Sequence, residues 1–360
     1  MQALTRRQAC FGLAATAAWP AAAAEGESLA QIAARKGIRF GSMVNAKHLQ
    51  DARLKALIER ECVIVVPENE LKWRFVQPTK GHLDFGPADA IIDFASAHGM
   101  AFRGHTTAWY NAVPKWASEE MGSSGRFTPA LNYLEAAMAR YRGRVLEWDV
   151  VNEAIHIRDG RPDGLRKSIL LSTSGPGYIA DCFRAARAAD GQAALFYNDF
   201  GVEYHWPDIL ARRASMLKLL EGLKKEGAPI DGLGIQAHLK VGNRFSEASW
   251  RAFLKEVAGM GLKLSITELD VDDTRLPGDP AARDAAVSDH MRQFLDVTLD
   301  EPAVKTLLTW GLSDRYFWLT NFFPRSDGRP SRGLPYDAEM QPKSMRATLA
   351  QALLGARSRP

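Results

Sequence analysis

The sequence is poor in cysteine and carries almost no excess of charge. Three cysteines in 360 residues are too few for a disulfide scaffold. With 46 Lys and Arg against 42 Asp and Glu, the formal net charge of +4 is too small for a protein that depends on nucleic-acid phosphates. Cysteine and histidine show no metal-ligand spacing, and no serine or cysteine lies in a nucleophile turn. We therefore expect no metal, no cofactor and no nucleic-acid partner. An acyl-transfer enzyme is also not expected, because the sequence offers no serine or cysteine nucleophile for it.

Long apolar runs are also missing, except at the N-terminus. Arg6 and Arg7 precede a small, apolar stretch at 9–24, which ends in an Ala-Ala-Ala site of the kind that signal peptidases cleave. This stretch is too short and too rich in alanine for a good transmembrane helix. We predict an export signal over 1–24, either of twin-arginine type or an ordinary secretory signal with two adjacent arginines. A bacterial protein with this signal reaches the periplasm or the medium, with no membrane partner after cleavage.

Cleavage of this signal leaves only two cysteines, Cys62 and Cys182, in the mature chain 25–360. A twin-arginine substrate folds in the reducing cytoplasm before export, so we expect no bridge between them. Free cysteines are among the most buried residues in proteins. Two buried thiols are therefore the prediction, and a Cys62–Cys182 bridge is the alternative if the signal is an ordinary secretory one.

The rest of the chain alternates between two patterns. From about residue 39, short apolar runs are each followed by a stretch with apolar residues at i, i+3 and i+4 and with Gly or Pro at its ends. The predicted strands are 39–44, 62–68, 101–107, 145–153, 194–199, 232–238, 263–270 and 307–314. The predicted helices are 51–60, 88–98, 129–141, 178–189, 207–225, 246–260, 281–299 and 343–354. Eight such units without a glycine-rich phosphate turn favour an α/β fold, a single (β/α)8 TIM barrel over 25–360, rather than a doubly wound sheet.

Polar and aromatic side chains recur where these predicted strands end. In chain order they are Glu68, Asn69, Lys72, His105, Trp109, Asn152, Glu153, Asn198, Asp199, Gln236, His238, Glu268, Asp270, Trp310, Asp314 and Trp318. The C-terminal ends of the strands build the active site of a TIM barrel. Because burying ionisable groups is costly unless they are paired, this repetition indicates a single polar cleft lined with aromatic rings.

Two of these residues form a candidate catalytic pair. Glu153 and Glu268 end the fourth and seventh predicted strands, on opposite sides of an eight-stranded ring. Two carboxyl groups that face each other across a cleft suit glycoside hydrolysis, in which one is the acid and the other a nucleophile or base. Either residue alone could equally form a structural ion pair. Together, beside Asn152 and His238, they favour a catalytic role.

Several longer motifs carry a family resemblance. They are Glu68-Asn69-Glu70-Leu71-Lys72-Trp73, Arg103-Gly104-His105-Thr106 with Trp109, Trp148-Asp149-Val150-Val151-Asn152-Glu153-Ala154, Gln236-x-His238, the run 261–271 around Ile266-Thr267-Glu268-Leu269-Asp270, and the pair Trp310 and Trp318. From about Phe40 to the C-terminus, the chain resembles the xylanases of glycoside hydrolase family 10. The resemblance implies a retaining endo-β-1,4-xylanase that cleaves xylan or xylo-oligosaccharides by double displacement, without a cofactor and expected as a monomer.

The resemblance also implies a role for each matching residue. Glu153 would be the general acid/base and Glu268 the nucleophile. Asn152 would hold the 2-hydroxyl of the reacting sugar, while His238 would hydrogen-bond Glu268 and be oriented by Asp270. The implied substrate-binding residues are Glu68, Asn69, Lys72, His105 and Trp109 for glycone sugars, Gln236 near the acid/base, Phe200 for the leaving-group sugar, and Trp310 and Trp318 as wall and roof. We interpret three other motif residues as packing or capping residues and leave them out of the site: Asp149, Glu70 and Trp73.

The sequence departs from the family pattern at three places. Where the family commonly reads W-H-x-Q, Tyr110 replaces the second histidine and Ala112 the glutamine that contacts glycone hydroxyls. Phe200 replaces a tyrosine after the fifth strand, and the segment 319–332 lacks the family's usual short path and is rich in Phe, Arg and Pro. These departures predict weaker binding of plain linear xylan. Two alternatives therefore stay open, a non-catalytic glycan-binding barrel and an enzyme that prefers short, decorated oligosaccharides.

Overall fold

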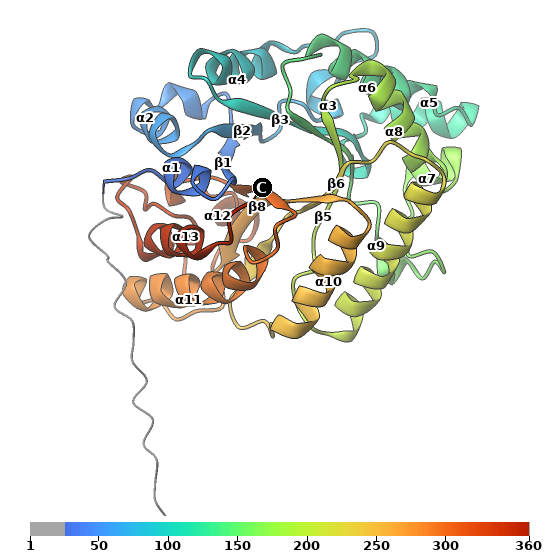
Figure 1. Ribbon diagram of the computed structural model, residues 1–360. Coiled ribbons are helices and arrows are strands. Elements are labelled where there is room, and N and C mark those ends of the chain that lie inside the picture. Colours follow the sequence, from blue (N-terminus) through green and yellow to red (C-terminus); the bar gives the residue numbers. More distant parts are fainter. Residues whose placement is uncertain (1–25, 360) are drawn as a thin grey trace, which may run out of the picture.

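The computed structural model describes residues 26–359, so the predicted export signal lies outside the described residues. Within this range, eight parallel strands form a closed ring in the order β1-β2-β3-β4-β5-β6-β8-β9, and β9 pairs with β1. The ring strands are β1 (Arg39–Val44), β2 (Ile64–Pro67), β3 (Ala101–Trp109), β4 (Glu147–Asn152), β5 (Ala194–Asp199), β6 (Gly232–Ile235), β8 (Lys263–Asp272) and β9 (Val304–Thr309). Helices surround the ring (Figure 1). The predicted (β/α)8 TIM barrel is thereby confirmed.

Two predicted strands end elsewhere than the sequence pattern suggested. The predicted strand 232–238 is interrupted after β6, because Ala237 takes a left-handed backbone with φ of 60°, and a short strand, β7 (His238–Lys240), then pairs with the end of β8. The predicted strand 307–314 is β9, which begins and ends earlier. The apolar run continues past β9, but Gly311 has a φ of 116°. Glycine adopts this backbone conformation readily, whereas a residue in a β-strand has a negative φ, so the strand cannot continue through Gly311.

The main helices lie close to their predicted positions. They are α2 (Ala52–Glu61), α4 (Gly86–Ala97), α6 (Thr128–Arg140), α8 (Tyr178–Ala189), α9 (Pro207–Lys225), α10 (Glu247–Gly259), α11 (Pro280–Thr298) and α13 (Ser344–Gly355). Side-chain caps fix some of the starts. Asp51 accepts hydrogen bonds from the first-turn N–H groups of α2, and Asp279 caps α11, whose first residue is proline.

Further short helices lie between these units and were not predicted. They are α1 (Leu29–Ala34), α3 (Trp73–Val76), α5 (Lys115–Ser124), α7 (Ile169–Ser174) and α12 (Leu319–Phe322), with 3-10 turns at His48–Gln50, Tyr110–Ala112, Ile157–Asp159 and Asp314–Tyr316. Apart from α1, which precedes β1, these elements lie in the connections that follow β1, β2, β3, β4 and β9. They therefore belong to the loops at the end of the barrel where active sites are built.

The barrel interior is filled by side chains. All six residues of β4 are buried, as expected for a parallel strand covered on both faces. The indole of Trp148 fills the space beside Gly104, where a Cβ atom would lie 2.1 Å from the ring. Arg103 is fully buried and pairs with Asp149 and with Glu147, whose nearest oxygen is 2.8 Å away. The interior is thus a packed core and not a pore.

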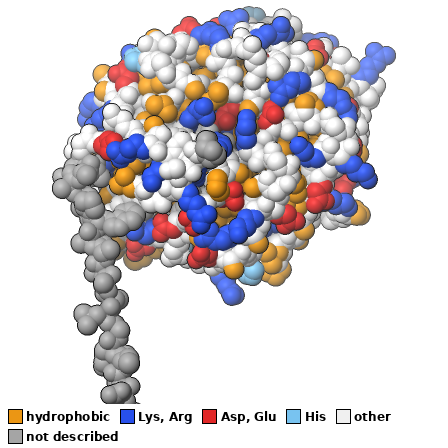
Figure 2. Space-filling model, in the orientation of Figure 1, with side chains coloured by type: hydrophobic (Ala, Val, Ile, Leu, Met, Phe, Trp, Pro, Cys, Tyr) orange, Lys and Arg blue, Asp and Glu red, His pale blue; other side chains and the backbone are white. Residues whose placement is uncertain are grey.

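The end of the barrel where the strands begin is covered by the C-terminal segment. Arg359 donates hydrogen bonds to the carbonyls of Val304, at the start of β9, and of Lys36, before β1. The C-terminus therefore lies in the middle of the view in Figure 1. On this face, Lys and Arg side chains are interspersed with Asp and Glu, in keeping with the small net charge (Figure 2).

Both cysteines of the described chain, Cys62 and Cys182, are free and buried, which confirms the prediction of two buried thiols. Burial raises the pKa of each thiol. Among residues 26–359, no helix is both long and apolar enough to cross a membrane.

Candidate active site

Glu153 follows β4 directly and is held in an unusual backbone conformation. Its φ is 59°, its N–H donates to the carbonyl of Asn198, and its own carbonyl accepts a 2.8 Å hydrogen bond from Arg166 Nε. Such left-handed backbone costs energy in a residue with a side chain and persists only where neighbours enforce it. The constraint fixes where the Glu153 carboxyl points.

The Glu153 carboxyl is buried and surrounded by amides. Its Oε1 accepts hydrogen bonds from Gln236 Nε2 at 3.0 Å and from Asn152 Nδ2 at 3.2 Å. Burial raises the pKa of Glu153, and the carboxylates of Asp199 and Glu268 raise it further, although the Gln236 hydrogen bond opposes them. This carboxyl is therefore suited to hold its proton to higher pH than an ordinary glutamate does.

Glu268 lies inside β8 and has the opposite electrostatic setting. Its Oε2 is 3.2 Å from His238 Nε2, and its Oε1 accepts a 2.9 Å hydrogen bond from Asn198 Nδ2. Burial opposes ionisation, but the hydrogen bond from His238 and the charges of His105 and Lys72 outweigh it, so the pKa of Glu268 lies below its ordinary value. This carboxyl is suited to remain ionised.

A chain of contacts leads outward from Glu268. His238 Nδ1 is 2.9 Å from Asp270 Oδ1, and Trp318 Nε1 donates a 2.6 Å hydrogen bond to the other Asp270 oxygen. Although burial disfavours the cation, the two carboxylates hold the pKa of His238 well above its ordinary value. A cationic imidazole next to Glu268 stabilises the Glu268 carboxylate. The predicted order Glu268–His238–Asp270 is thus present as a set of direct contacts.

Two amide side chains connect the carboxyl groups to each other. Asn198 Nδ2 donates both to Glu268 Oε1 and to Asn152 Oδ1, each at 2.9 Å. Asn152 in turn donates to Glu153, and Thr267 fixes the Asn198 amide by donating to its Oδ1 at 2.8 Å. Asn198 ends β5 and was noted only as a polar strand end. The structure makes it the amide that bridges the two halves of the site.

A buried carboxylate that the sequence analysis missed shapes the segment between these groups. Glu203 accepts the backbone N–H groups of Ala237 at 3.1 Å and Val202 at 2.8 Å. Ala237 is thereby held in its left-handed conformation, with Gln236 on one side and His238 on the other. Gln236 then reaches Glu153 while His238 reaches Glu268. Glu203 lies in a loop, where no periodic pattern marks it as buried.

The predicted glycone residues form a second group around Lys72. Its ammonium lies 4.8 Å from the centre of the Trp109 ring and 5.9 Å from that of Trp310, and it donates to Asn69 Oδ1 at 3.2 Å. Burial lowers the pKa of Lys72, but the carboxylates of Glu268, Glu68 and Glu153 act to keep its charge. The charge of Lys72 therefore depends on the three carboxylates around it.

The remaining predicted contacts extend this group. His105 packs edge-on to Trp310, with ring centres 5.5 Å apart, and its Nδ1 is 3.0 Å from Asp149. Glu68 accepts a 2.9 Å hydrogen bond from Asn45, a residue that sequence reasoning did not select. Three neighbours stay in structural roles: Asp149 pairs with Arg103, Glu70 accepts the N–H groups of Ala46 and Asn69, and Trp73 stacks on Tyr133.

Three residues that depart from the family pattern, Tyr110, Ala112 and Phe200, lie in the loops that follow β3 and β5. The Tyr110 ring stacks on the guanidinium of Arg166, which lies 4.0 Å from the ring centre. Ala112 is buried, with 1% of its surface exposed, and its methyl group is therefore not open to a ligand. Phe200 is partly exposed and presents one ring face to Arg212, 4.4 Å away.

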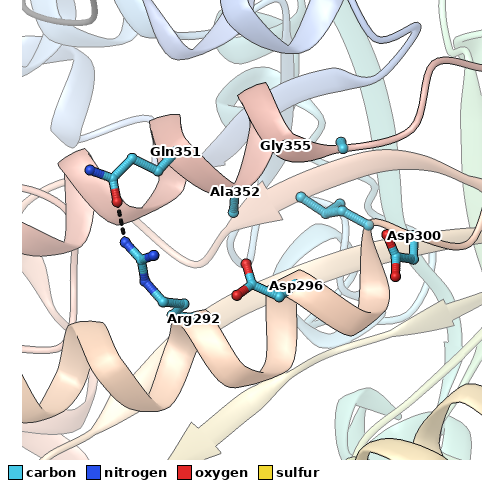
Figure 3. Close-up of a pocket in the computed structure, with 8 residues that line it drawn as sticks. Arg292, Asp296, Asp300, Gln351, Ala352 and Gly355 are labelled. Carbon is cyan, nitrogen blue, oxygen red and sulfur yellow. Dashed lines mark hydrogen bonds between the residues drawn. The ribbon is translucent and has the colours of Figure 1, made fainter. Parts of the chain in front are cut away.

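A cavity of about 540 Å³ lies elsewhere, between α11 and α13 (Figure 3). Its lining includes Asp296, Asp300 and Arg292, and Arg292 donates to Gln351. None of the predicted site residues lines it, and it lies at the ends of helices that return to the start of the strands. Nor is any group of three or more His, Cys, Asp or Glu side chains placed to hold a metal ion within residues 26–359. The candidate site is therefore the carboxyl pair at the other end of the barrel.

A TIM barrel that holds two buried carboxyls with oppositely shifted pKa values at the C-terminal ends of its strands is typical of a glycoside hydrolase. Residues 28–352 match the family described as glycosyl hydrolase family 10. The chain belongs to this family, as the sequence motifs predicted.

Relatives with known names and structures agree with this assignment. Endo-1,4-beta-xylanase B of Thermotoga neapolitana is 31% identical over 308 residues, which cover 85% of each chain. Endo-1,4-beta-xylanase C of Phanerodontia chrysosporium is 31% identical over 84% of this chain and 74% of its own. The structure is similar to native xylanase 10B from Thermotoga maritima (TM-score 0.79, 31% identity, covering 91% of this chain and 98% of that one). It is also similar to xylanase 10B from Thermotoga petrophila RKU-1 in complex with xylobiose (TM-score 0.80, 29% identity, 91% and 97% covered).

Proposed function

We propose that the protein is a retaining endo-β-1,4-xylanase that hydrolyses xylan or xylo-oligosaccharides by double displacement, acting as a monomer. The observation that carries this proposal is the pair Glu153 and Glu268, whose pKa values are displaced in opposite directions within one hydrogen-bonded site. In glycosidases the carboxyl with the raised pKa is the acid, and the ionised carboxyl is the nucleophile of retaining enzymes or the base of inverting ones. The resemblance to retaining xylanases makes Glu268 the nucleophile here. The names of the xylanase relatives support the choice of substrate.

In the first step, the Glu268 carboxylate attacks the anomeric carbon of the sugar on the glycone side. The bond from this carbon to the glycosidic oxygen breaks while Glu153 transfers its proton to that oxygen, and the shortened sugar chain leaves as an alcohol. The result is a glycosyl ester on Glu268 and an ionised Glu153. His238 keeps Glu268 available as a carboxylate before the attack.

In the second step, Glu153 acts as a base. It takes a proton from a water molecule whose oxygen attacks the anomeric carbon, and the ester bond to Glu268 breaks. Glu153 is protonated again, Glu268 is a carboxylate again, and two inversions leave the β configuration. We assign to Asn152, which donates to Glu153 and accepts from Asn198, the role of holding the 2-hydroxyl in the transition state.

Reducing-sugar release from xylan tests the proposal. Glu268→Ala should lose nearly all activity, whereas Glu135→Ala, which changes an exposed carboxylate on α6, should keep it. In kcat/KM, which reports the first step, Glu153→Ala should lose far less on aryl xylosides with good leaving groups than on xylan, because those groups need no proton. A protein without xylan hydrolysis in the wild type would instead be a glycan-binding barrel. Equal loss in both variants on aryl xylosides would refute the acid/base role of Glu153.

The stereochemistry of the product gives an independent test. NMR recorded during the first turnovers should detect the β anomer from a β-xyloside. Retaining enzymes hold their carboxyls roughly 5–5.5 Å apart, whereas inverting enzymes leave about 6.5–9.5 Å for a water molecule. An α anomer as the first product would contradict the role of Glu268 as nucleophile.

The proposal also includes export through a signal at 1–24. The basis is the sequence Arg6-Arg7 followed by an apolar stretch and an alanine-rich cleavage site. Replacing both arginines with lysine should stop export by the twin-arginine route and leave active enzyme in the cytoplasm. Export that continues unchanged would indicate an ordinary secretory signal.

A further inference from the structure

An exposed aromatic pair, Phe322 and Phe323, lies next to the site and has no role in the proposed mechanism. Phe322 is 71% exposed and Phe323 60%, which are larger fractions than those of any other large hydrophobic side chain in residues 26–359. Pro324, the next residue, is exposed as well. Consecutive exposed apolar residues lower solubility and are retained where they bind something.

The aromatic pair is in contact with the catalytic residues through one indole. The Trp318 ring lies 6.0 Å from the centre of Phe322 and 5.9 Å from that of Phe323. The same indole lies 5.3 Å from the His238 ring and donates to Asp270. The pair is thus separated from Glu268 by Trp318 and His238. Together with Trp318 it forms a continuous set of aromatic side chains beside the site.

The segment that presents the aromatic pair is fastened to the barrel. Arg325, almost fully buried, donates to the carbonyls of Asp273 and Leu276 in the segment after β8. Gly333 brings the segment against β8 so closely that a Cβ atom would lie 1.9 Å from the Val271 carbonyl, and the Gly333 carbonyl accepts the Val271 N–H. A fastened segment holds the two phenyl rings in place before a ligand arrives, which lowers the entropy lost on binding.

We propose that the aromatic pair binds the apolar face of a neutral sugar side group carried by the xylan chain. This inference rests on the proposed xylanase function. Phenyl rings offer no hydrogen bond, but their faces stack against the C–H face of a sugar ring and withdraw both from water. The nearby arginines are engaged, Arg325 with the backbone and Arg332 with Asp284, so charge does not select an acidic group.

The position of the aromatic pair favours a side group over the main chain. A main-chain sugar that reacts at Glu268 lies next to His238, whose ring centre is 5.3 Å from that of Trp318. The aromatic pair packs against the same indole and belongs to the segment 319–332, which departs from the family pattern. A side group that projects from the main chain past Trp318 therefore meets the two phenyl rings.

The test compares two substrates of equal main-chain length, a linear xylotetraose and a xylotetraose with a single pentose side group, the latter prepared with the group at each position in turn. The variant Phe322→Ala/Phe323→Ala should lose about tenfold in kcat/KM on the decorated substrate whose side group reaches the pair. This corresponds to roughly 60 Å² of apolar surface that is no longer withdrawn from water. On linear xylotetraose the change should stay within twofold.

Two further variants make the result specific. Phe322→Tyr/Phe323→Tyr keeps both ring faces and should keep activity on the decorated substrate. Leu146→Ala removes a partly exposed apolar side chain just before β4, at the opposite end of the barrel, and should change neither substrate. If the wild type cleaves xylan, the inference would be overturned by a Phe322→Ala/Phe323→Ala variant that loses equally on linear and decorated substrates. It would also be overturned by a variant that loses activity on neither. A wild type that cleaves neither substrate would refute the proposed function itself.

Discussion

The hydrogen bond from Gln236 to Glu153 should lower the pH above which activity falls, because it lowers the pKa of the general acid. Gln236 Nε2 donates to Glu153 Oε1 at 3.0 Å and so stabilises the ionised carboxylate against burial. Replacing Gln236 by leucine keeps a similar volume but removes the donor. The ionised form of Glu153 loses stabilisation, its pKa rises further, and Glu153 keeps its proton to higher pH.

The size of this change follows from the hydrogen bond. A hydrogen bond to a charged group contributes about 1.5–3 kcal/mol, and about 1.4 kcal/mol corresponds to one pKa unit, which gives roughly one to two units. Asn152 Nδ2 still donates to the same oxygen at 3.2 Å and compensates in part. We therefore expect the upper limb of the kcat/KM profile to move up by about one unit in Gln236→Leu.

The assay is the pH dependence of kcat/KM on a linear xylo-oligosaccharide. Gln351→Leu, which changes an exposed amide on α13, serves as the control and should leave the profile in place. An aryl xyloside with a good leaving group should lack this limb in both proteins, because its departure needs no proton. An upper limb that stays where it is, or moves down, in Gln236→Leu would refute the reasoning.

Three further predictions concern the groups around the carboxyl pair and beneath it. His238→Asn removes the cation beside Glu268, so the pKa of Glu268 should rise and the acidic limb of the kcat/KM profile should move to higher pH by about one unit. An acidic limb that does not move would show that His238 does not control the ionisation of Glu268. Glu203→Gln replaces one of the two carboxylate oxygens by an NH₂ group that faces a backbone N–H, which disturbs the segment carrying Gln236 and His238. The kcat value should therefore fall about tenfold with KM little changed. A fall in thermal stability without a fall in kcat would indicate a purely structural role. Asp149→Ala leaves buried Arg103 with Glu147 as its remaining carboxylate and should lower the free energy of unfolding by about 3 kcal/mol in urea titration; Asp89→Ala, which breaks a more exposed pair with Arg140, should cost at most about 1 kcal/mol.

The regular part of the fold could be predicted because its signals are local. Apolar runs and helical periodicity placed β1, β5 and α8 at their observed bounds. The misplaced strand at 307–314 and the broken strand at 232–238 show where local signals fail. At the first, a glycine conformation ends the strand within an apolar run, and at the second, a carboxylate from another loop, Glu203, holds the backbone of Ala237.

The candidate site was predictable as a set of residues but not as a network. Glu153, Glu268 and His238 could be selected because they recur at strand ends and match motifs. That Asn198 bridges Glu268 and Asn152 depends on side-chain directions in three strands, which the sequence does not specify.

Trapping the glycosyl-enzyme tests the central claim most directly. A 2-deoxy-2-fluoro-β-xylobioside with a dinitrophenyl leaving group should react once and accumulate, because the fluorine slows both steps while the leaving group accelerates the first. The intact mass should rise by one fluorinated disaccharide, and peptide mapping should locate it on Glu268. A label on any other residue, or an unchanged mass in a protein that cleaves xylan, would contradict the assignment of Glu268 as the nucleophile.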